Sequence, residues 1–439
     1  MLKYRWWLMK NKLNLRKFLI LFIFFSMLVI CIKKAITTNI ITESNEADIK
    51  SYNVIDTIES DQEVINSVFE EGMDTDDYKS LFDRISTNVT SEGTYQLINY
   101  DFENRLTYKK IEEYIHEMSK SSIVNTYIIG KTLDNRSIYN VEIGKGSKVL
   151  LLDAGIHAAE SANTHILMKF LIDILNDYES NSEIVVNMLN NVKIASIPCI
   201  NPDGYEAYSF GIENINNKEL WLYQNKSNVD FKRFKYNANG IDINRNFPTQ
   251  NAGLYYLEEK LHKSVAFSKT TAKGKYYGGN TLGSEPETKA VMYQDLTHYK
   301  NAYAYINLHS QGRVIYSGKP NLSDEYNRLT IDLCNRIGNI TGYKVHGLSR
   351  EEIGQGNDGT ASDFMAELAN GFIFSSKTGR LSSSSYKNNS SAFIYPVPAI
   401  VVETMDDNYK DAKKFKDEYY NHGIKEMLYD LLKYGTELN

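Results

Sequence analysis

The pattern of apolar and polar residues predicts an α/β domain over most of the chain. Short apolar runs bounded by turn residues predict buried strands, and between several of them the apolar residues recur at helical spacing. The expected strands cover residues 123–130, 138–144, 149–154, 192–198, 304–308 and 399–402. Runs without polar alternation are typical of a sheet covered on both faces. The pattern therefore predicts a mixed, mostly parallel sheet with helices on both faces.

Helical spacing is clearest in three segments. Residues 106–120 are charged on one face and apolar on the other, which predicts the first helix of the folded domain. Apolar residues between 166 and 175 predict a helix directly after the third strand, and residues 409–434 predict one charged amphipathic helix at the end. The Ser- and Asn-rich stretch 379–391 predicts a flexible polar loop.

The N-terminal region has the pattern of a membrane-targeting segment. Residues 18–32 contain no charge, six Lys and Arg residues precede them, and Lys33 and Lys34 follow. As a helix this run spans about 22 Å, which leaves either a short anchor with snorkelling lysines or the apolar core of a signal peptide. We expect an uncleaved anchor. The excess of positive charge before the run places the chain after Lys34 outside the cell membrane.

These patterns divide the chain into four parts. Residues 1–17 form a basic cytoplasmic segment, residues 18–34 the anchor, residues 35–96 a spacer and residues 97–437 the folded domain. Acidic residues dominate the spacer between positions 43 and 77, which predicts a solvated stalk.

Composition excludes some functions. The formal net charge of −6 lacks the basic surplus that nucleic-acid binding requires, so we expect no nucleic-acid partner. The three cysteines are Cys31, Cys199 and Cys334, and the first lies in the apolar N-terminal run. They imply no disulfide framework.

Candidate metal ligands follow two of the expected strands. His157 and Glu160 come directly after "LLLDAG", and His309 ends the run "AYINLH". The carboxyl ends of parallel strands meet at one edge of a sheet, and two histidines with one carboxylate are ligands typical of a catalytic zinc ion. The alternative is that His157 and Glu160 only begin a helix, where an acidic side chain is favourable.

Three further residues have suitable chemistry for amide hydrolysis. Glu403 ends the strand "PAIVVE" and would accept a proton from the attacking water, although a strand-end glutamate is also an ordinary solvated residue. Asn244 and Arg245 follow an expected short strand in "GIDINRNFP", and such a pair binds a carboxylate. The stretch "NPDG" at 201–204 predicts a sharp turn.

Taken in order, these motifs resemble a known family. They occur in the order and approximate spacing of the metallocarboxypeptidases of the carboxypeptidase A type, over residues 100–433. Within that family "HSQG" and "SEPET" are most similar to the bacterial branch that cleaves γ-D-glutamyl-diamino acid bonds in peptidoglycan stem peptides. The motifs are "GIHAAE", "NPDGYE", "GIDINRNFP", "YYGGNTLGSEPETKA", "INLHSQG" and "IVVET".

The resemblance implies a role for each candidate residue. It makes His157, Glu160 and His309 the ligands of one zinc ion and Glu403 the general base. It makes Asn244 and Arg245 the groups that bind the terminal carboxylate of the substrate.

The resemblance also implies a cation that stabilises the oxyanion of the scissile carbonyl. Arg233 is the best match in "DFKRFKYNANG", and Lys232 or Lys235 fits after a small shift.

One position departs from the family. Many members carry a mobile tyrosine about eight residues before the aspartate that matches Asp363, and this chain has Gln355 there. Closure over the substrate is therefore in question, whereas zinc hydrolysis is not. Ser362, at the position that helps to shape the specificity pocket in that family, is small and uncharged.

The sequence as a whole predicts a zinc metallopeptidase anchored outside a bacterial membrane. Its substrate would be an amide next to a free carboxylate, in cell-wall stem peptides or other extracellular peptides. Two alternatives remain: a wall-binding module that has lost turnover, and a zinc-dependent deacylase of the aspartoacylase type.

Overall fold

A computed structural model gives the fold of the chain. It describes residues 86–225, 234–250, 252, 277–279, 281–317, 322–346, 359–375, 380–382 and 396–438. The expected anchor at 18–34 and the acidic stretch 43–77 lie outside these residues. Within the described residues no helix is both long enough and apolar enough to cross a membrane.

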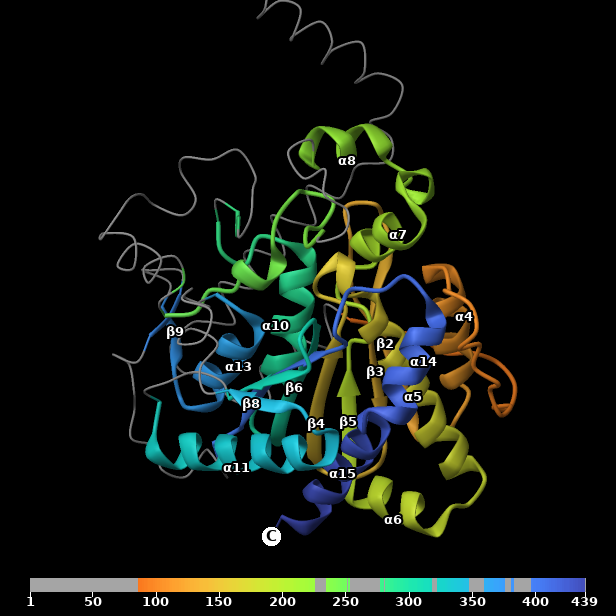
Figure 1. Cartoon of the computed structure of the whole chain (residues 1–439), viewed down its shortest axis with the longest axis vertical. Coiled ribbons are helices and arrows are strands. Elements are labelled where there is room, and N and C mark those ends of the chain that lie inside the picture. The colour runs from red at the N-terminus through yellow and green to blue at the C-terminus, as the bar shows by residue number, and fades with distance from the viewer. Residues whose placement is uncertain are drawn as a thin grey trace, which may run out of the picture. The chain divides into compact units, whose positions relative to one another are not determined.

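In the described part of the chain a mixed sheet of nine strands forms the centre of the domain, in the order β1-β2-β3-β5-β4-β6-β11-β7-β8. Figure 1 shows it between two groups of helices. The strands are β1 (Thr87–Asn88), β2 (Val124–Lys131), β3 (Ser137–Ile143), β4 (Lys148–Ala154), β5 (Val192–Ser196), β6 (Ala302–Ser310), β7 (Val314–Tyr316), β8 (Lys344–His346) and β11 (Ala399–Thr404). A separate antiparallel pair joins β9 (Ile373–Ser375) and β10 (Arg380–Ser382).

The parallel part of the sheet is smaller than the sequence predicts. The neighbours β5, β4, β6 and β11 are parallel, as are β7 and β8. Antiparallel pairing joins β1, β2, β3 and β5, and also β7 and β11. A short connection between β2 and β3 allows only antiparallel neighbours, because a parallel crossover needs a much longer connection.

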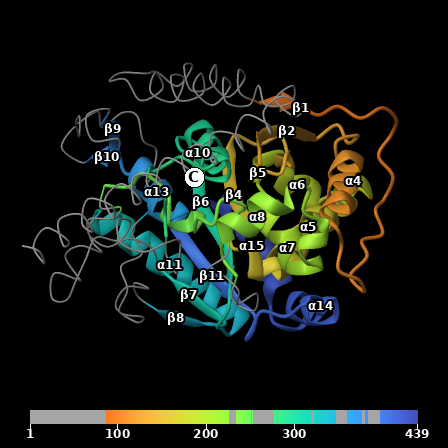
Figure 2. The ribbon, with the colours of Figure 1, turned by 90° about the horizontal axis from the view of Figure 1, so that it is seen from above.

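Helices cover both faces of the sheet. α5 (Ser161–Glu179), α6 (Glu183–Asn191) and α15 (Ile424–Glu437) pack on one face, where α4 (Tyr108–Met118), α11 (Asp324–Thr341) and α14 (Ala412–Asn421) join them. α10 (Pro286–His298) and α13 (Ala361–Ala369) pack against strands from the other side, as Figure 2 shows from above. The described residues also form the helices α7 (Pro202–Phe210) and α8 (Lys218–Asn225), and the 3-10 helices η2 (Ala158–Glu160), η3 (Ile212–Asn214) and η5 (Ile243–Arg245).

The sequence predicts one helix over residues 409–434, and this prediction is wrong in one respect, because the structure has two separate helices, α14 and α15. Gly423 lies between them with φ of +71°, and a Cβ there would come within 2.6 Å of the carbonyl oxygen of Ile340. Apolar residues recur at helical spacing on both sides of the break, so helical spacing alone did not divide the segment. Similarly, β10 occupies the beginning of the stretch 379–391 that the sequence predicts as a loop.

The folded part of the chain includes residues before position 97. β1 pairs with β2, and Val89 and Tyr95 are buried in the hydrophobic core. A two-residue strand carries too little pattern to be recognised in the sequence, which is why the expected spacer extends to residue 96.

Candidate active site

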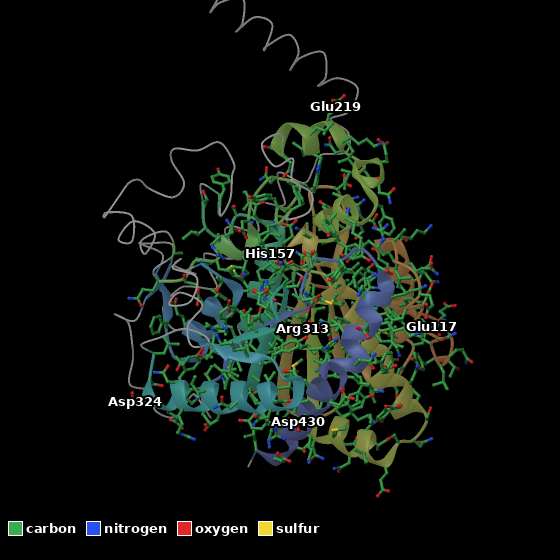
Figure 3. The ribbon with its side chains drawn as sticks, in the orientation of Figure 1. Glu117, His157, Glu219, Arg313, Asp324 and Asp430 are labelled. Atoms are coloured by element: carbon green, nitrogen blue, oxygen red, sulfur yellow. The ribbon has the colours of Figure 1, made fainter. Side chains whose placement is uncertain are left out.

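The three expected metal ligands converge at the carboxyl ends of central strands. His157 and Glu160 follow β4, and His309 is the penultimate residue of β6. One ligand atom from each residue lies within 4.8 Å of the others, and all three side chains are buried. Figure 3 shows His157 at the upper end of the central strands.

The donor set fits a zinc ion. Nδ1 of His157 lies 2.8 Å from Oε1 of Glu160, and Nδ1 of His309 lies 3.0 Å from Oε2 of the same carboxylate. Two imidazole nitrogens and one carboxylate are the ligands of many catalytic zinc sites. Burial alone would raise the pKa of Glu160, but His157, Lys235 and His309 hold that pKa well below its usual value. The group is therefore charged, as a metal ligand must be.

Asp242 is a site residue that the sequence analysis did not identify. Its Oδ1 lies 3.3 Å from Nε2 of His157, on the edge of the ring that faces away from Glu160. Burial would raise the pKa of Asp242, but His157 lowers it to about 2. Carboxylates that contact the outer nitrogen of a metal-binding histidine orient its ring. The sequence does contain a signal for Asp242, because this residue stands two positions before Asn244 in the motif "GIDINRN".

The "NPDG" stretch begins a helix and is not a simple turn. The side chain of Asn201 accepts a hydrogen bond from the backbone nitrogen of Gly204, and Pro202 occupies the first turn of α7. A Cβ at position 204 would come within 2.7 Å of the Ala158 side chain. Gly204 therefore lets α7 pack closely on η2, the 3-10 helix that carries Glu160.

Glu403 lies beside the metal ligands. It is on β11, where it pairs in parallel register with His309 of β6. Its side chain is partly buried. Desolvation, followed by the charge of Glu160, raises the pKa of Glu403 to about 8. A carboxylate with a raised pKa is a stronger base, which suits a residue that must accept a proton from water.

The sequence predicts that Asn244 and Arg245 follow a short strand. The structure instead places both residues in the 3-10 helix η5. Asn244 Oδ1 accepts a hydrogen bond of 3.0 Å from the backbone nitrogen of Ala361, the first residue of α13. Because Oδ1 accepts this bond, the side-chain amide nitrogen of Asn244 is the group that can donate a hydrogen bond. Arg245 Nη1 donates to the carbonyl oxygen of Asn244 at 2.6 Å.

The loop that carries this pair is held by Asn246. Its side-chain nitrogen donates to the carbonyl oxygens of Gly278 and Thr281, at 2.8 and 2.9 Å. Its Oδ1 accepts from the backbone nitrogen of Glu285, in the "SEPET" motif. The motif that carries part of the family resemblance therefore supports the loop of Asn244 and Arg245.

The structure describes only one of the three cations that the sequence offers for stabilising the oxyanion. Arg233 and Lys232 lie outside the described residues, as does Gln355. Lys235 lies in the site, with its Nζ 3.5 Å from Oε1 of Glu160 and 3.4 Å from Nδ1 of His157.

The structure also places Ser362 and His165. Ser362 is buried in the first turn of α13, where its hydroxyl lies 3.2 Å from that of Thr360, and Asp363 follows it. His165 is buried away from the ligands, next to the hydroxyl groups of Tyr100 and Tyr205. His165 is therefore a packed residue.

Comparisons with known proteins agree with this site. The family of zinc carboxypeptidases matches residues 111–416. Gamma-D-glutamyl-L-diamino acid endopeptidase 1 of Lysinibacillus sphaericus is 30% identical over 223 residues, which cover 49% of this chain and 52% of that protein. Carboxypeptidase O of Bos taurus is 26% identical over 267 residues, covering 58% and 64%. The chain thus spans less than two thirds of the length of either relative.

Solved structures show the same fold. Thrombin activatable fibrinolysis inhibitor superposes with a TM-score of 0.55 at 17% identity, covering 77% of this chain and 76% of that one. Carboxypeptidase A from Helicoverpa armigera gives 0.52 at 16% identity, covering 79% and 76%. The chain belongs to the zinc carboxypeptidase family, a family of zinc-dependent peptidases. The expected family and its zinc cofactor are therefore confirmed.

Proposed function

We propose that this protein is a zinc metallopeptidase that hydrolyses an amide bond next to a free carboxylate. The observation that carries the proposal is the convergence of His157, Glu160 and His309, with Glu403 next to His309 in the sheet register. A binding module would need neither the base nor the ligand set.

The residues of the site divide the reaction between them. A zinc ion held by the three ligands would polarise the scissile carbonyl and the attacking water. Glu403 accepts the proton of that water as the oxygen bonds to the carbonyl carbon. It then passes the proton to the amine nitrogen as the carbon–nitrogen bond breaks. Arg245, with the amide of Asn244, holds the substrate carboxylate and so aligns the amide with the base.

The substrate class that we propose is a cell-wall stem peptide. The relative from Lysinibacillus sphaericus is named for γ-D-glutamyl-L-diamino acid bonds, and it shares 30% identity with this chain. A diamino acid at the end of a stem peptide carries a free carboxylate next to its amide nitrogen, which suits the proposed role of Arg245. Ser362 adds no charge to the position that shapes the specificity pocket.

We also propose that the enzyme is held at the outer face of a cell membrane by residues 18–34. The support is the apolar run with its basic flank, whose charge bias favours export of the domain. A stem-peptide substrate would be available there.

Two other functions are compatible with the fold. A non-catalytic wall-binding module would retain affinity without turnover. A zinc-dependent deacylase would release an acyl group from a small amide and would not require a peptide.

The test is to incubate the full chain with purified muropeptides and identify the products by mass spectrometry. We expect release of the terminal diamino acid, and no release after chelation of zinc. Binding without products would favour the wall-binding module. Cleavage of small acyl amides alone would favour the deacylase.

A further inference from the structure

The proposed base and the ligand Glu160 lie on elements that the sheet does not join. Glu403 is on β11, whereas Glu160 precedes the long helix α5. Glu403 is also the last residue but one of its strand, and Met405, directly after the strand, has φ of +60°. Backbone pairing of β11 with β7 ends at Glu403. The end of β11 therefore has less support from backbone pairing than its middle.

A hydrogen bond between two side chains connects these elements. The hydroxyl of Thr404, the residue after Glu403, donates to Oδ1 of Asn163 at 2.7 Å. Asn163 lies in the first turn of α5, three residues after Glu160. The same hydroxyl lies 3.2 Å from the carbonyl oxygen of His309. The contact therefore joins the strand of the base to the elements that carry two of the metal ligands.

Both side chains of this bond are completely buried. Thr404 and Asn163 are each 0% exposed. A buried hydroxyl or amide costs free energy unless it is hydrogen-bonded, and valine would suit the end of a buried strand equally well. Thr404 and Glu403 are neighbours on a strand, so their side chains point to opposite faces of the sheet. The bond therefore holds the backbone of Glu403 from the face opposite to its carboxylate.

We propose that Thr404 and Asn163 are positioning residues, whose hydrogen bond fixes the base Glu403 relative to the metal ligands. This inference rests on the proposed function. The bond anchors the backbone next to Glu403 to the helix that follows Glu160. A base is effective only within hydrogen-bond reach of the water whose proton it accepts, and a displacement of about 1 Å at a reacting group costs up to about 100-fold in rate.

The test begins with Thr404→Val in the full chain, which replaces the hydroxyl by a methyl group of similar size. We expect kcat on a peptide with a free carboxylate to fall about tenfold, because the base is less well aligned. KM should not change, since Asn244 and Arg245 are not altered. The zinc content should equal that of the wild type, because all three ligands are present. Thr404→Ser keeps the hydroxyl and should recover most of the turnover.

The double variant Asn163→Leu with Thr404→Val separates positioning from stability. Thr404→Val alone leaves the amide of Asn163 buried without its partner, so the unfolding equilibrium should shift about fivefold towards the unfolded state. Replacing both partners by apolar groups should restore most of that loss, because neither side chain then buries an unsatisfied polar group. The kcat of the double variant should stay low, since no directed bond remains. A purely structural role would let turnover recover with stability.

The matched control is Ser196→Ala. Ser196 lies on β5 and is also completely buried, and its hydroxyl donates to the carbonyl oxygen of Leu152. This variant should lose stability as Thr404→Val does, because one buried hydrogen bond is removed. It should keep the wild-type kcat, since the bond joins no element to the strand of the base.

Three results would overturn the proposal. One is a wild-type kcat in Thr404→Val, and another is recovery of turnover in the double variant. The third is that Asn163→Leu and Thr404→Val change stability independently, because bonded partners are energetically coupled. If the wild type hydrolyses no peptide, the proposed function fails and the positioning role fails with it, whereas the coupling in stability still shows whether Thr404 and Asn163 are bonded.

Discussion

Glu403 and His309 are direct partners in the register of two parallel strands, β11 and β6. The proposed base and one metal ligand are therefore placed relative to each other by the backbone hydrogen bonds of the sheet. A loop could not hold two groups at a fixed separation so reliably, because loops have more conformational freedom. This register gives the site its rigid part, and the loops around Glu160, Lys235 and Arg245 supply the remaining groups.

The ligands and the base should respond differently to substitution. We expect the wild-type chain to retain about one zinc ion, and His157→Ala or His309→Ala to lose it, because two protein ligands bind zinc weakly. Glu160→Gln should weaken retention too. Glu403→Gln should keep the metal and lose about 100- to 10,000-fold in kcat, since it removes only the proton acceptor. Metal analysis and kinetics on the same preparations give both quantities, and a Glu403→Gln protein without zinc would contradict the assignment.

Arg245 should matter only for substrates with a free carboxylate. Arg245→Ala should lower kcat/KM for such a peptide by roughly thirty- to a thousand-fold, because a charge-assisted contact of about 2 to 4 kcal/mol is lost. The same peptide amidated at that end should be a poor substrate for both proteins. Arg245→Lys should recover part of the loss, since a point charge replaces the planar fork.

The control for this comparison is Arg336→Ala, in which a partly exposed arginine paired with Asp430 is removed. Both peptides should be cleaved at the wild-type rate by this variant. Equal cleavage of the acid and the amide by wild-type enzyme would mean that Arg245 holds no substrate carboxylate.

Asp242 should act through His157. Asp242→Asn removes the negative charge that lies 3.3 Å from Nε2 of that ring, and we expect zinc affinity to fall about 10- to 100-fold. Competition with a chelator measures the change. Asp295→Asn is a suitable control, because Asp295 is also fully buried and is not among the metal-ligand group. An equal loss of affinity in both variants would point to general destabilisation.

Asp153 should make stability depend on pH. Burial raises its pKa from 3.8 to about 7 in the folded chain, so the folded state binds more protons than the unfolded state between these values. Stability should therefore fall as the pH rises through this window, by about 1.4 kcal/mol for each pH unit from this one group. In Asp153→Asn, Oδ1 still accepts the hydrogen bond from Ile197, and this contribution disappears. Chemical unfolding at pH 5, 6 and 7 measures both proteins, and parallel pH profiles would contradict the assignment.

The orientation of the chain is open to a direct test on cells. A protease added to intact cells should cut in the acidic region 43–77 and release a soluble, active fragment, because the basic flank favours retention of the N-terminus inside. A cytoplasmic protein in the same cells serves as the control for lysis. If the fragment is released only after lysis, residues 97–437 are not outside.

Much of the fold follows from local pattern. The strands that became β2 to β6 and β11 were predicted to within a few residues, because an apolar run in a covered sheet is visible in the sequence itself. The helices α4 and α5 were predicted from apolar residues that recur at helical spacing. The break at Gly423 was not, since both halves of the segment carry the same period. The positive φ of Gly423 and its close approach to Ile340 are properties of the folded chain.

The sequence by itself determined which side chains we propose for the chemistry. His157, Glu160, His309 and Glu403 each follow or end an apolar strand, and the position of a residue at a strand end is a local property of the chain. Only the tertiary structure decided their neighbours. Asp242 and Lys235 reach His157 and Glu160 across about 80 positions of sequence, through loops held by hydrogen bonds to distant backbone. Such contacts depend on how the elements pack, and packing leaves no period in the sequence from which it could be predicted.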